Sequence, residues 1–225
     1  MPNLALVGYG KMGRMIDQLA AEYDFTVTAR VDVGREESLD NADVAIEFST
    51  PAAAMGNICK LAEKHIPSVV GTTGWLEHLD EAKRIVADNN SALIWSPNFS
   101  IGVNVFQRVV AETARLLKDE KEYGAWAWEI HHITKRDAPS GTLLHIVEAM
   151  KKAGYSREIS VGSNRAGAHP GTHEIGFDSL ADTITLRHVA RSREGFARGA
   201  LKAAQWIIGR KGFYEFGEAL FGART

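Results

Sequence analysis

Cysteine is almost absent from this 225-residue sequence, in which Cys59 is the single example. One thiol cannot form an internal disulfide framework, and it cannot supply the several thiolates of a cysteine-based zinc site. Such scarcity fits a protein that stays in a reducing compartment. We interpret Cys59 as a small apolar packing residue rather than as a catalytic thiol.

The sequence also lacks a charge excess and a long apolar run. It holds 26 basic and 28 acidic residues, so no polybasic surface indicates a nucleic acid or an anionic membrane as a partner. No run approaches the roughly 20 apolar residues of a membrane span, and no signal sequence precedes the first strand pattern. These absences predict a soluble cytoplasmic protein that acts on a small molecule.

What the sequence does contain is a regular alternation of short apolar strands and amphipathic helices up to Trp95. Strands are predicted at residues 3–7, 25–33, 44–48, 68–70 and 92–95, and helices at 14–22, 52–65 and 76–89. Such alternation predicts an α/β fold with a doubly wound parallel sheet and right-handed crossovers. Residues 34–43 are polar and leave little room for a full crossover helix.

The pattern changes after Pro97. A long helix at 103–118 is followed by an aromatic strand at 124–133, a helix at 141–152, and strands at 159–163, 171–177 and 182–190. The last three strands have no long helix between them, which favours a smaller α+β domain with a mainly antiparallel sheet. A final helix at 195–209 could return to the first sheet. We therefore expect one domain from residues 1–100 with 195–225, and a second from residues 101–194.

A glycine motif follows the first predicted strand and precedes the first helix. In that context the pattern Gly8-x-Gly10-x-x-Gly13 is typical of a Rossmann-like dinucleotide site. The first glycine permits a tight turn, the second lets the backbone approach a pyrophosphate, and the third lets the helix pack on the strand. Asp32 ends the second strand, where a carboxylate would bind the adenosine ribose. An acid there favours NADH, whereas Arg35 could accept a 2'-phosphate, so the cofactor is NADH or NADPH.

Two later loops also fall at the carboxyl ends of predicted strands, where open parallel sheets bind ligands. They offer backbone amides, hydroxyl groups and, at Phe99, an aromatic face suited to a nicotinamide ring. With the glycine motif and Asp32, the predicted cofactor-binding residues are Gly8, Tyr9, Gly10, Lys11, Met12, Gly13, Asp32, Gly71, Thr72, Thr73, Ser96, Pro97, Asn98 and Phe99.

The densest chemistry lies in the segment from Glu129 to Thr142. It contains two histidines, a lysine, two carboxylates and a Pro-Ser-Gly-Thr turn. Imidazole exchanges protons near neutral pH, ammonium donates a proton or binds an anion, and a glycine turn presents backbone N–H groups to a carboxylate. Adjacent residues of a strand face opposite ways, so His131 and His132 can enter one pocket only if the strand ends there. The segment predicts a pocket for a small anionic substrate.

These motifs resemble those of the dihydrodipicolinate reductase family, in its shorter bacterial form. The resemblance covers nearly the whole chain and is carried by residues 8–13, 71–74, 97–104, 196–200 and, above all, Glu129-Ile-His-His-x-x-Lys135-x-Asp-Ala-Pro-Ser-Gly-Thr142. It implies NAD(P)H-dependent reduction of 4-hydroxy-tetrahydrodipicolinate to tetrahydrodipicolinate with loss of water, in lysine and diaminopimelate biosynthesis.

The resemblance also implies roles for individual residues. His131 corresponds to the family's proton donor or acceptor and Lys135 to its proton donor, while His132, Gly141 and Thr142 correspond to contacts with a carboxylate of the cyclic dicarboxylate substrate. The family's homotetramer, formed through its second sheet, is implied as well, and the 101–194 domain would then serve substrate binding and oligomerisation. The chain departs from longer members in its short 34–43 connection and in Leu186-Arg187.

Other interpretations of the residues stay open. The chain could be a different small-substrate NAD(P)-dependent dehydrogenase on the same fold, or a nucleotide-sensing protein without catalysis. A zinc site from His131, His132 and Asp137 is disfavoured because the spacing lacks a usual ligand pattern, so we predict no metal. Arg165 and His173 fall in segments that either reach the pocket or form surface hairpin turns.

Overall fold

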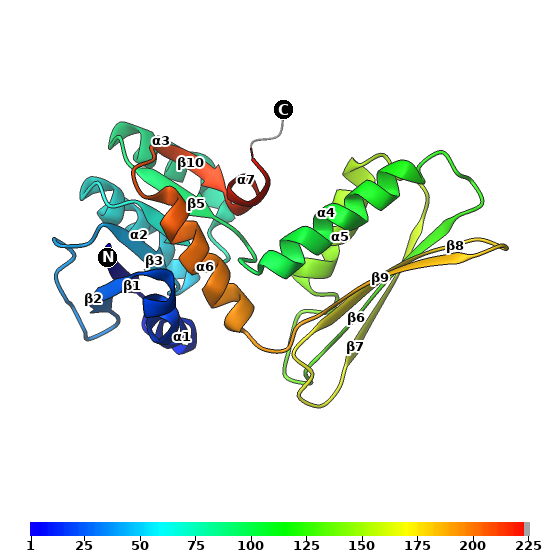
Figure 1. The fold of residues 1–225 in the computed structure, drawn as a ribbon, viewed down its shortest axis with the longest axis horizontal. Coiled ribbons are helices and arrows are strands. Elements are labelled where there is room, and N and C mark those ends of the chain that lie inside the picture. Colours follow the sequence, from blue (N-terminus) through cyan, green and yellow to red (C-terminus); the bar gives the residue numbers. More distant parts are fainter. Residues whose placement is uncertain (223–225) are drawn as a thin grey trace. The chain divides into compact units, whose positions relative to one another are not determined.

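The computed structural model describes residues 1–222 and divides them into two compact units. The first unit contains Met1–Ser100 and the chain from Glu194 onward, and the second contains Ile101–Arg193 (Figure 1). Residues 223–225, which end the predicted 195–225 segment, lie outside the described residues. Within the described part of the chain, no helix is long and apolar enough to cross a membrane.

The first unit is a six-stranded parallel sheet with the strand order β10-β5-β4-β3-β1-β2. Its strands are β1 (Asn3–Val7), β2 (Thr26–Val31), β3 (Val44–Glu47), β4 (Ser68–Val70), β5 (Ala92–Trp95) and β10 (Gly212–Glu215). Its helices are α1 (Lys11–Leu19), α2 (Pro51–Glu63), α3 (Leu79–Asp88), α6 (Glu194–Ile207) and α7 (Phe216–Phe221), with short 3₁₀ turns at Ala20–Tyr23 and Leu76–His78.

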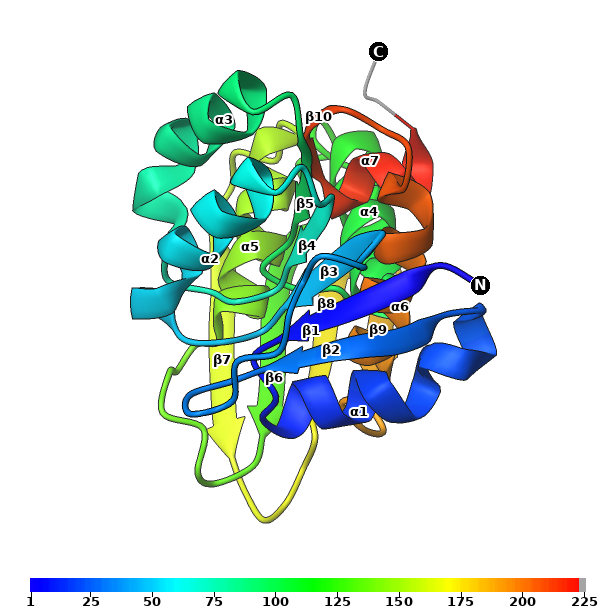
Figure 2. The same ribbon diagram turned by 90° about the vertical axis from the view of Figure 1, so that its left-hand side faces the viewer.

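Helices cover both faces of this sheet. α1 and α6 pack together on one face, and α2 and α3 pack together on the other (Figure 2). The central strands are therefore buried on both sides, which explains why residues 4–7 of β1 and 44–46 of β3 are apolar without alternation. This arrangement confirms the predicted doubly wound parallel sheet, and no helix lies between β2 and β3 within the described chain.

The second unit is a four-stranded sheet with two helices on one face (Figure 1). Its strands are β6 (Gly124–His131), β7 (Ile159–Arg165), β8 (Thr172–Asp178) and β9 (Thr183–Val189), and its helices are α4 (Ile101–Leu116) and α5 (Gly141–Lys152). The strand order is β7-β6-β8-β9, and the apolar core lies between the sheet and the helices.

The pairing of β6 with β7 differs from the others in the second sheet. β6 pairs in parallel with β7, while the pairs β6–β8 and β8–β9 are antiparallel. The sheet is therefore mixed, although mainly antiparallel as predicted. The physical reason is the connection: β6 and β7 are joined through α5, and a helical crossover returns the chain in the same direction.

Alternation along β6 assigns its side chains to the two faces of the sheet. Ala125, Ala127, Glu129 and His131 are buried on the helix-covered face, whereas Trp126 and Trp128 are half-buried on the opposite face. The Trp128 indole donates to Asn164 there, and Glu174 pairs with Arg187 across β8 and β9. Leu186, next to Arg187, packs against the core instead.

Candidate active site

The loop between β1 and α1 and the first turn of α1 contain two glycines that the fold requires and one that it does not. Gly8 has a φ of 92°, and a Cβ on it would lie 2.1 Å from the Phe48 carbonyl oxygen. A Cβ on Gly13 would lie 2.3 Å from the Gly8 oxygen. A Cβ on Gly10, the residue before α1, would have no neighbour within 4 Å. The helix N-terminus is therefore open at Gly10, where its N–H groups favour an anion such as a phosphate.

The end of β2 brings an acid to this loop. One carboxylate oxygen of Asp32 accepts a hydrogen bond from the Tyr9 N–H at 3.2 Å, and the other accepts from the Val33 N–H at 2.9 Å. The Arg35 guanidinium lies 5.2 Å from the centre of the Tyr9 ring and donates to Glu37 at 2.6 Å. Parallel pairing of β1 with β2 explains why residues so far apart in the sequence meet here. Lys11 and Met12 occupy the first turn of α1, exposed and half-buried respectively.

The two other predicted loops follow β4 and β5. Thr72 accepts a hydrogen bond from the Ser49 N–H at 2.7 Å through its hydroxyl, and Ser96 donates to the Asn98 carbonyl at 2.8 Å. Gly71 lies against the Phe48 ring, since a Cβ there would be 2.1 Å from Phe48 Cζ. Both loops are thus held by their own side chains at the carboxyl end of the sheet.

The expected aromatic face at Phe99 is contradicted by the structure. The Phe99 side chain is only 1% exposed and packs between Phe48 and Phe216, with ring centres 6.3 Å and 4.9 Å away. Burying the Phe99 ring among apolar side chains is more favourable in free energy than exposing it to solvent beside a polar loop. Phe99 can therefore face a ligand only through its backbone. Phe48 lies directly after β3, half-buried in the same cluster, and no motif in the sequence indicated its contact with Phe99.

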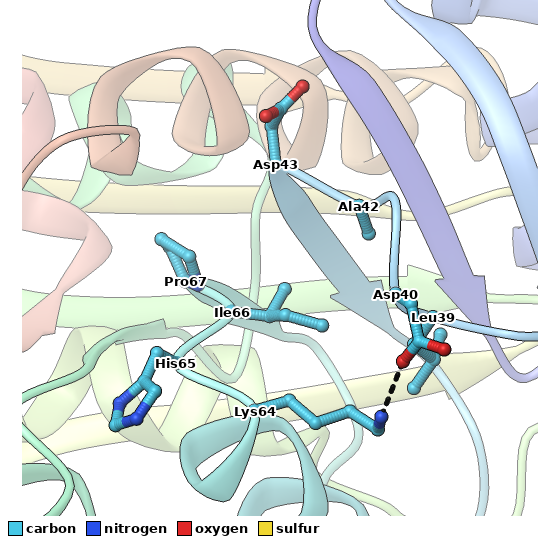
Figure 3. Close-up of a pocket in the computed structure, with 8 residues that line it drawn as sticks. All are labelled: Leu39, Asp40, Ala42, Asp43, Lys64, His65, Ile66 and Pro67. Carbon is cyan, nitrogen blue, oxygen red and sulfur yellow. Dashed lines mark hydrogen bonds and ion pairs between the residues drawn. The ribbon is translucent and has the colours of Figure 1, made fainter.

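A hollow in the first unit lies at the opposite ends of the strands, before β3 and β4 (Figure 3). Its lining residues are Leu39, Asp40, Ala42, Asp43, Lys64, His65, Ile66 and Pro67. The charged groups are already paired: Lys64 donates to Asp40 at 2.7 Å, and Asp43 accepts from the Asn3 N–H at 2.7 Å. Because open parallel sheets bind ligands at their carboxyl ends, this hollow does not belong to the dinucleotide site.

In the second unit, the end of β6 separates the two adjacent histidines. His131 is the last residue of the strand and is buried, whereas His132 lies after it, half-buried, with its Nδ1 2.7 Å from the Thr134 hydroxyl. The strand therefore ends two residues before the predicted 133. Irregular backbone after His131 removes the constraint that neighbouring side chains face opposite ways.

Glu129 is a buried carboxylate surrounded by donors. The Arg165 guanidinium, the Ser163 hydroxyl and the Ser140 N–H donate to its Oε1 at 2.9, 2.8 and 2.8 Å, and the Ser140 hydroxyl donates to Oε2. Burial raises the pKa of Glu129, but hydrogen bonds from His173, Ser140 and Ser163 outweigh burial and hold the pKa well below its usual range. The side chain is fully buried and ionised.

His131 is a neutral imidazole at neutral pH. Burial lowers its pKa to about 4, and the nearby charges of His173, Lys135 and Arg165 act in the same direction, while Glu129 opposes them. Its buried Nδ1 lies 3.4 Å from Glu129 Oε2 and forms no hydrogen bond with any described residue. A neutral imidazole carries one proton, and a nearby carboxylate, which only accepts, favours that proton on Nδ1.

Lys135 and the start of α5 converge on one carboxylate. Lys135 Nζ donates to both oxygens of Asp137 at 2.7 and 2.8 Å, and the Gly141 N–H donates to one of them at 3.3 Å. Burial raises the Asp137 pKa, but the Lys135 hydrogen bond, the Lys135 charge and backbone N–H groups together outweigh burial and lower the pKa. Ser140 caps the helix by accepting from the Leu143 N–H, and Thr142 is half-buried in the first turn. An ammonium and a helix N-terminus thus bind a carboxylate together.

Arg165 and His173 belong to this site rather than to surface turns. Arg165 lies opposite His131 across β6 and β7, and His173 lies opposite Glu129 across β6 and β8. His173 is buried with its Nε2 3.4 Å from Glu129 Oε2, and its ring centre is 5.1 Å from that of His131. In the sequence, Arg165 and His173 could be noticed only as titratable residues in or next to predicted strands. Their partners in the site depend on the strand order and on the register of the pairing.

Glu129, His131 and His173 each place one ligand-type atom within 4.8 Å of the others. This trio differs from the set of His131, His132 and Asp137 weighed from the sequence. Its carboxylate already accepts hydrogen bonds from Arg165, Ser140 and Ser163. A bound cation would also face the Arg165 guanidinium, and this repulsion disfavours a metal site.

The low pKa of His131 predicts a specific pH dependence of stability. Between its ordinary pKa of about 6.5 and the folded value of about 4, the unfolded chain binds a proton that the folded chain does not. Lowering the pH through this window should therefore lower the melting temperature more in the wild type than in His131→Gln. Thermal melts at several pH values measure this difference. The same substitution at the exposed His78 is the control. If the melting temperature changed with pH equally in the wild type and in His131→Gln, the low pKa of His131 would be contradicted.

Comparison with known proteins places the chain in a family. The model of the dihydrodipicolinate reductase N-terminus matches residues 2–99, and that of the C-terminus matches residues 102–220. A 4-hydroxy-tetrahydrodipicolinate reductase of Christiangramia forsetii is 36% identical, over 97% of both chains. The enzyme of that name from Lawsonia intracellularis is 34% identical, over 90% of this chain and 92% of the relative.

Solved structures share the fold at low identity. A dipicolinate-bound dihydrodipicolinate reductase from Paenisporosarcina sp. TG-14 has a TM-score of 0.82 at 20% identity, over 97% of this chain and 99% of that one. An amine dehydrogenase from Mycobacterium smegmatis has a TM-score of 0.66 at 8% identity, over 100% and 97%. The fold alone is therefore shared with other dehydrogenases. The sequence matches, which span both units, show that this chain belongs to the dihydrodipicolinate reductase family.

Proposed function

We propose that this chain reduces 4-hydroxy-tetrahydrodipicolinate to tetrahydrodipicolinate, with loss of water, at the expense of NADH or NADPH. Membership of the family makes it an oxidoreductase of lysine and diaminopimelate biosynthesis. The observation that carries the proposal is the convergence of Lys135 and the Gly141 N–H on one carboxylate, close to the neutral His131. A dicarboxylate substrate needs such a carboxylate-binding site next to a proton donor.

Asp137 supports the carboxylate-binding role by occupying those donors in the free chain. A substrate carboxylate would take its place between the Lys135 ammonium and the Gly141 N–H, with Thr142 and His132 as further contacts. Lys135 is then both close to the substrate and able to give a proton as hydride transfer builds negative charge on it. The neutral His131 accepts or relays a proton rather than carrying a fixed positive charge.

A nicotinamide cofactor supplies the hydride. The open space at Gly10, in front of the α1 N-terminus, fits its pyrophosphate, and Asp32 fits the adenosine ribose. The loops at residues 71–73 and 96–99 would contribute backbone and hydroxyl groups. Arg35 would have to leave Glu37 before it could bind a 2'-phosphate, whereas Asp32 needs no rearrangement to accept ribose hydroxyls. Both NADH and NADPH therefore fit, through different residues.

The first test is an assay coupled to the preceding synthase, which generates the substrate in place from pyruvate and aspartate semialdehyde. We expect loss of NADH or NADPH absorbance, measured side by side. Lys135→Ala should lower kcat by about 10²–10⁴-fold, the usual contribution of one proton donor. Lys151→Ala, an exposed lysine of the same unit, should not. No oxidation of either cofactor with active synthase present would refute the function, and oxidation only with other substrates would indicate a different dehydrogenase.

The second test separates the glycines of the cofactor loop. Gly10→Ala should leave the melting temperature unchanged, because the new Cβ meets no protein atom. It should raise the KM for the cofactor by about 10- to 100-fold. The new methyl group would overlap with the pyrophosphate, and such an overlap weakens binding by about 1–3 kcal/mol. Gly56→Ala, which also meets no atom and lies within α2, is the matched control. An unchanged cofactor KM in Gly10→Ala would place the pyrophosphate elsewhere.

We also propose that the chain forms a homotetramer in the cytoplasm, through the face of the second sheet that its own helices leave uncovered. Trp126, Trp128 and Val189 lie on that face, and large apolar groups of this kind commonly mark protein contacts. Light scattering should give a mass four times the 24.6 kDa of the chain. Trp128→Glu should give smaller species, while Leu180→Glu, at an exposed turn, should not. A monomeric wild type would contradict the proposal.

A further inference from the structure

Glu129 and Arg165 form an ion pair beside the segment that carries both proposed proton-handling residues. Arg165 Nη2 lies 2.9 Å from Glu129 Oε1, and the two side chains are 15% and 0% exposed. Neither residue belongs to the loop from His132 to Pro139. A buried pair of this kind contributes little net stability relative to apolar residues, because desolvation offsets its attraction. The presence of this buried pair is therefore not explained by its contribution to the stability of the fold.

Arg165 contacts the backbone of the Lys135 turn directly. Its Nε donates to the Lys135 carbonyl at 3.3 Å, and its Nη2 donates to the Asp137 carbonyl. The turn contains no strand or helix between residues 132 and 139. Its backbone is held by hydrogen bonds from the Lys135 N–H to the His132 carbonyl and from the Ile133 N–H to the Gly167 carbonyl, both at 3.1 Å, and Arg165 binds the carbonyls that follow. The planar guanidinium, which donates in several directions at once, joins this turn to β7 and to Glu129.

Glu129 contacts the other proton-handling residue. His131 Nδ1 lies 3.4 Å from Glu129 Oε2, a contact between a ring nitrogen and a carboxylate, and this nitrogen forms no hydrogen bond with any described residue in the free chain. Catalytic hydrogen bonds are often long in the absence of substrate. Gly171 faces the other side of the ring, because a Cβ there would lie 2.9 Å from His131 Nε2. Because Gly171 has no side chain, the Nε2 edge of the His131 ring has room beside it.

We propose that Glu129 and Arg165 act as a positioning pair for the reaction. Glu129 keeps the single proton of His131 on Nδ1 and so leaves Nε2 as the nitrogen that serves the substrate, while Arg165 holds the turn that carries Lys135. Neither residue touches the substrate. The proposal rests on the proposed function, because it explains how the two residues assigned to proton transfer are held.

The test compares Glu129→Gln and Arg165→Lys with the wild type. The lysine retains the positive charge next to Glu129 but cannot reach both carbonyl groups of the turn. Arg157→Lys is the matched control, since Arg157 also donates to backbone carbonyls in the same unit, at Leu117, Lys118 and Tyr123. Each variant is measured by kcat, by the KM for each cofactor, and by ¹⁵N NMR of the histidine ring nitrogens, which distinguishes the two tautomers.

The two variants should have different signatures. Glu129→Gln should lower kcat by at least about tenfold and give a mixture of His131 tautomers, because the carboxylate that selects one is lost. Arg165→Lys should lower kcat by about 10- to 100-fold while leaving the His131 tautomer unchanged, because only the lysine turn is displaced. Cofactor KM should be unchanged in both. Arg157→Lys should change the melting temperature but not kcat.

The ¹⁵N NMR spectrum of the wild type tests the role of Glu129 even if Glu129→Gln does not fold. His131 protonated on Nε2 rather than Nδ1 would overturn the role of Glu129, and full activity of Arg165→Lys would overturn the role of Arg165. Failure of the proposed function looks different: no cofactor would be oxidised in the coupled assay, while the Nδ1 tautomer would still be seen in the wild type.

Discussion

The buried carboxylate of Glu129 is the interaction on which the second unit depends. A charge without water around it costs several kcal/mol unless donors surround it, so each of its partners is obligatory. Those partners come from separate elements: Ser140 starts α5, Ser163 and Arg165 lie on β7, and His173 lies on β8. Satisfying one charge therefore determines how three strands and a helix meet at the end of β6.

That requirement also sets the chemistry of the neighbouring residues. His131 shares the buried environment and is kept neutral by it, whereas Lys135 lies on an irregular turn where its charge is balanced by Asp137. One site thus holds a neutral imidazole and a charged ammonium together. Burial and neighbouring positive charges lower the pKa of His131 further below its usual value, while the Lys135 ammonium has the Asp137 carboxylate as its counter-ion.

The first unit depends on backbone approach instead of charge. Gly8 and Gly13 allow β1, β3 and α1 to come together at distances that no side chain would permit, and Gly10 leaves the helix terminus open. The contact at Gly13 acts between residues close in the sequence, whereas Gly8 faces the Phe48 carbonyl at the end of a neighbouring strand. The glycine motif, the strand before it and the helix after it could accordingly be predicted together, and the doubly wound sheet followed from the alternation of elements.

Some features could not be predicted because their causes are not local. β10 has four residues and forms only by pairing with β5, more than a hundred residues earlier, so its own sequence carries a weak signal. Alternation along the predicted strand indicated that His131 and His132 share a pocket only if the strand ends there, and the family resemblance implied roles for Lys135, Gly141 and Thr142 in the same segment. Phe99 was expected to offer its ring to a ligand, but the ring is covered by Phe48 and Phe216, which approach from other elements.

The residues proposed for the reaction could therefore be predicted from the sequence. The glycine loop and the 129–142 segment each contain their functional residues within one or two neighbouring elements. Tertiary structure alone decided which partners hold them. Arg165 reaches the Lys135 turn because β7 pairs in parallel with β6, and His173 reaches Glu129 because β8 pairs antiparallel in one register. A shift of one residue would turn either side chain to the opposite face of the sheet, and local sequence does not specify that register.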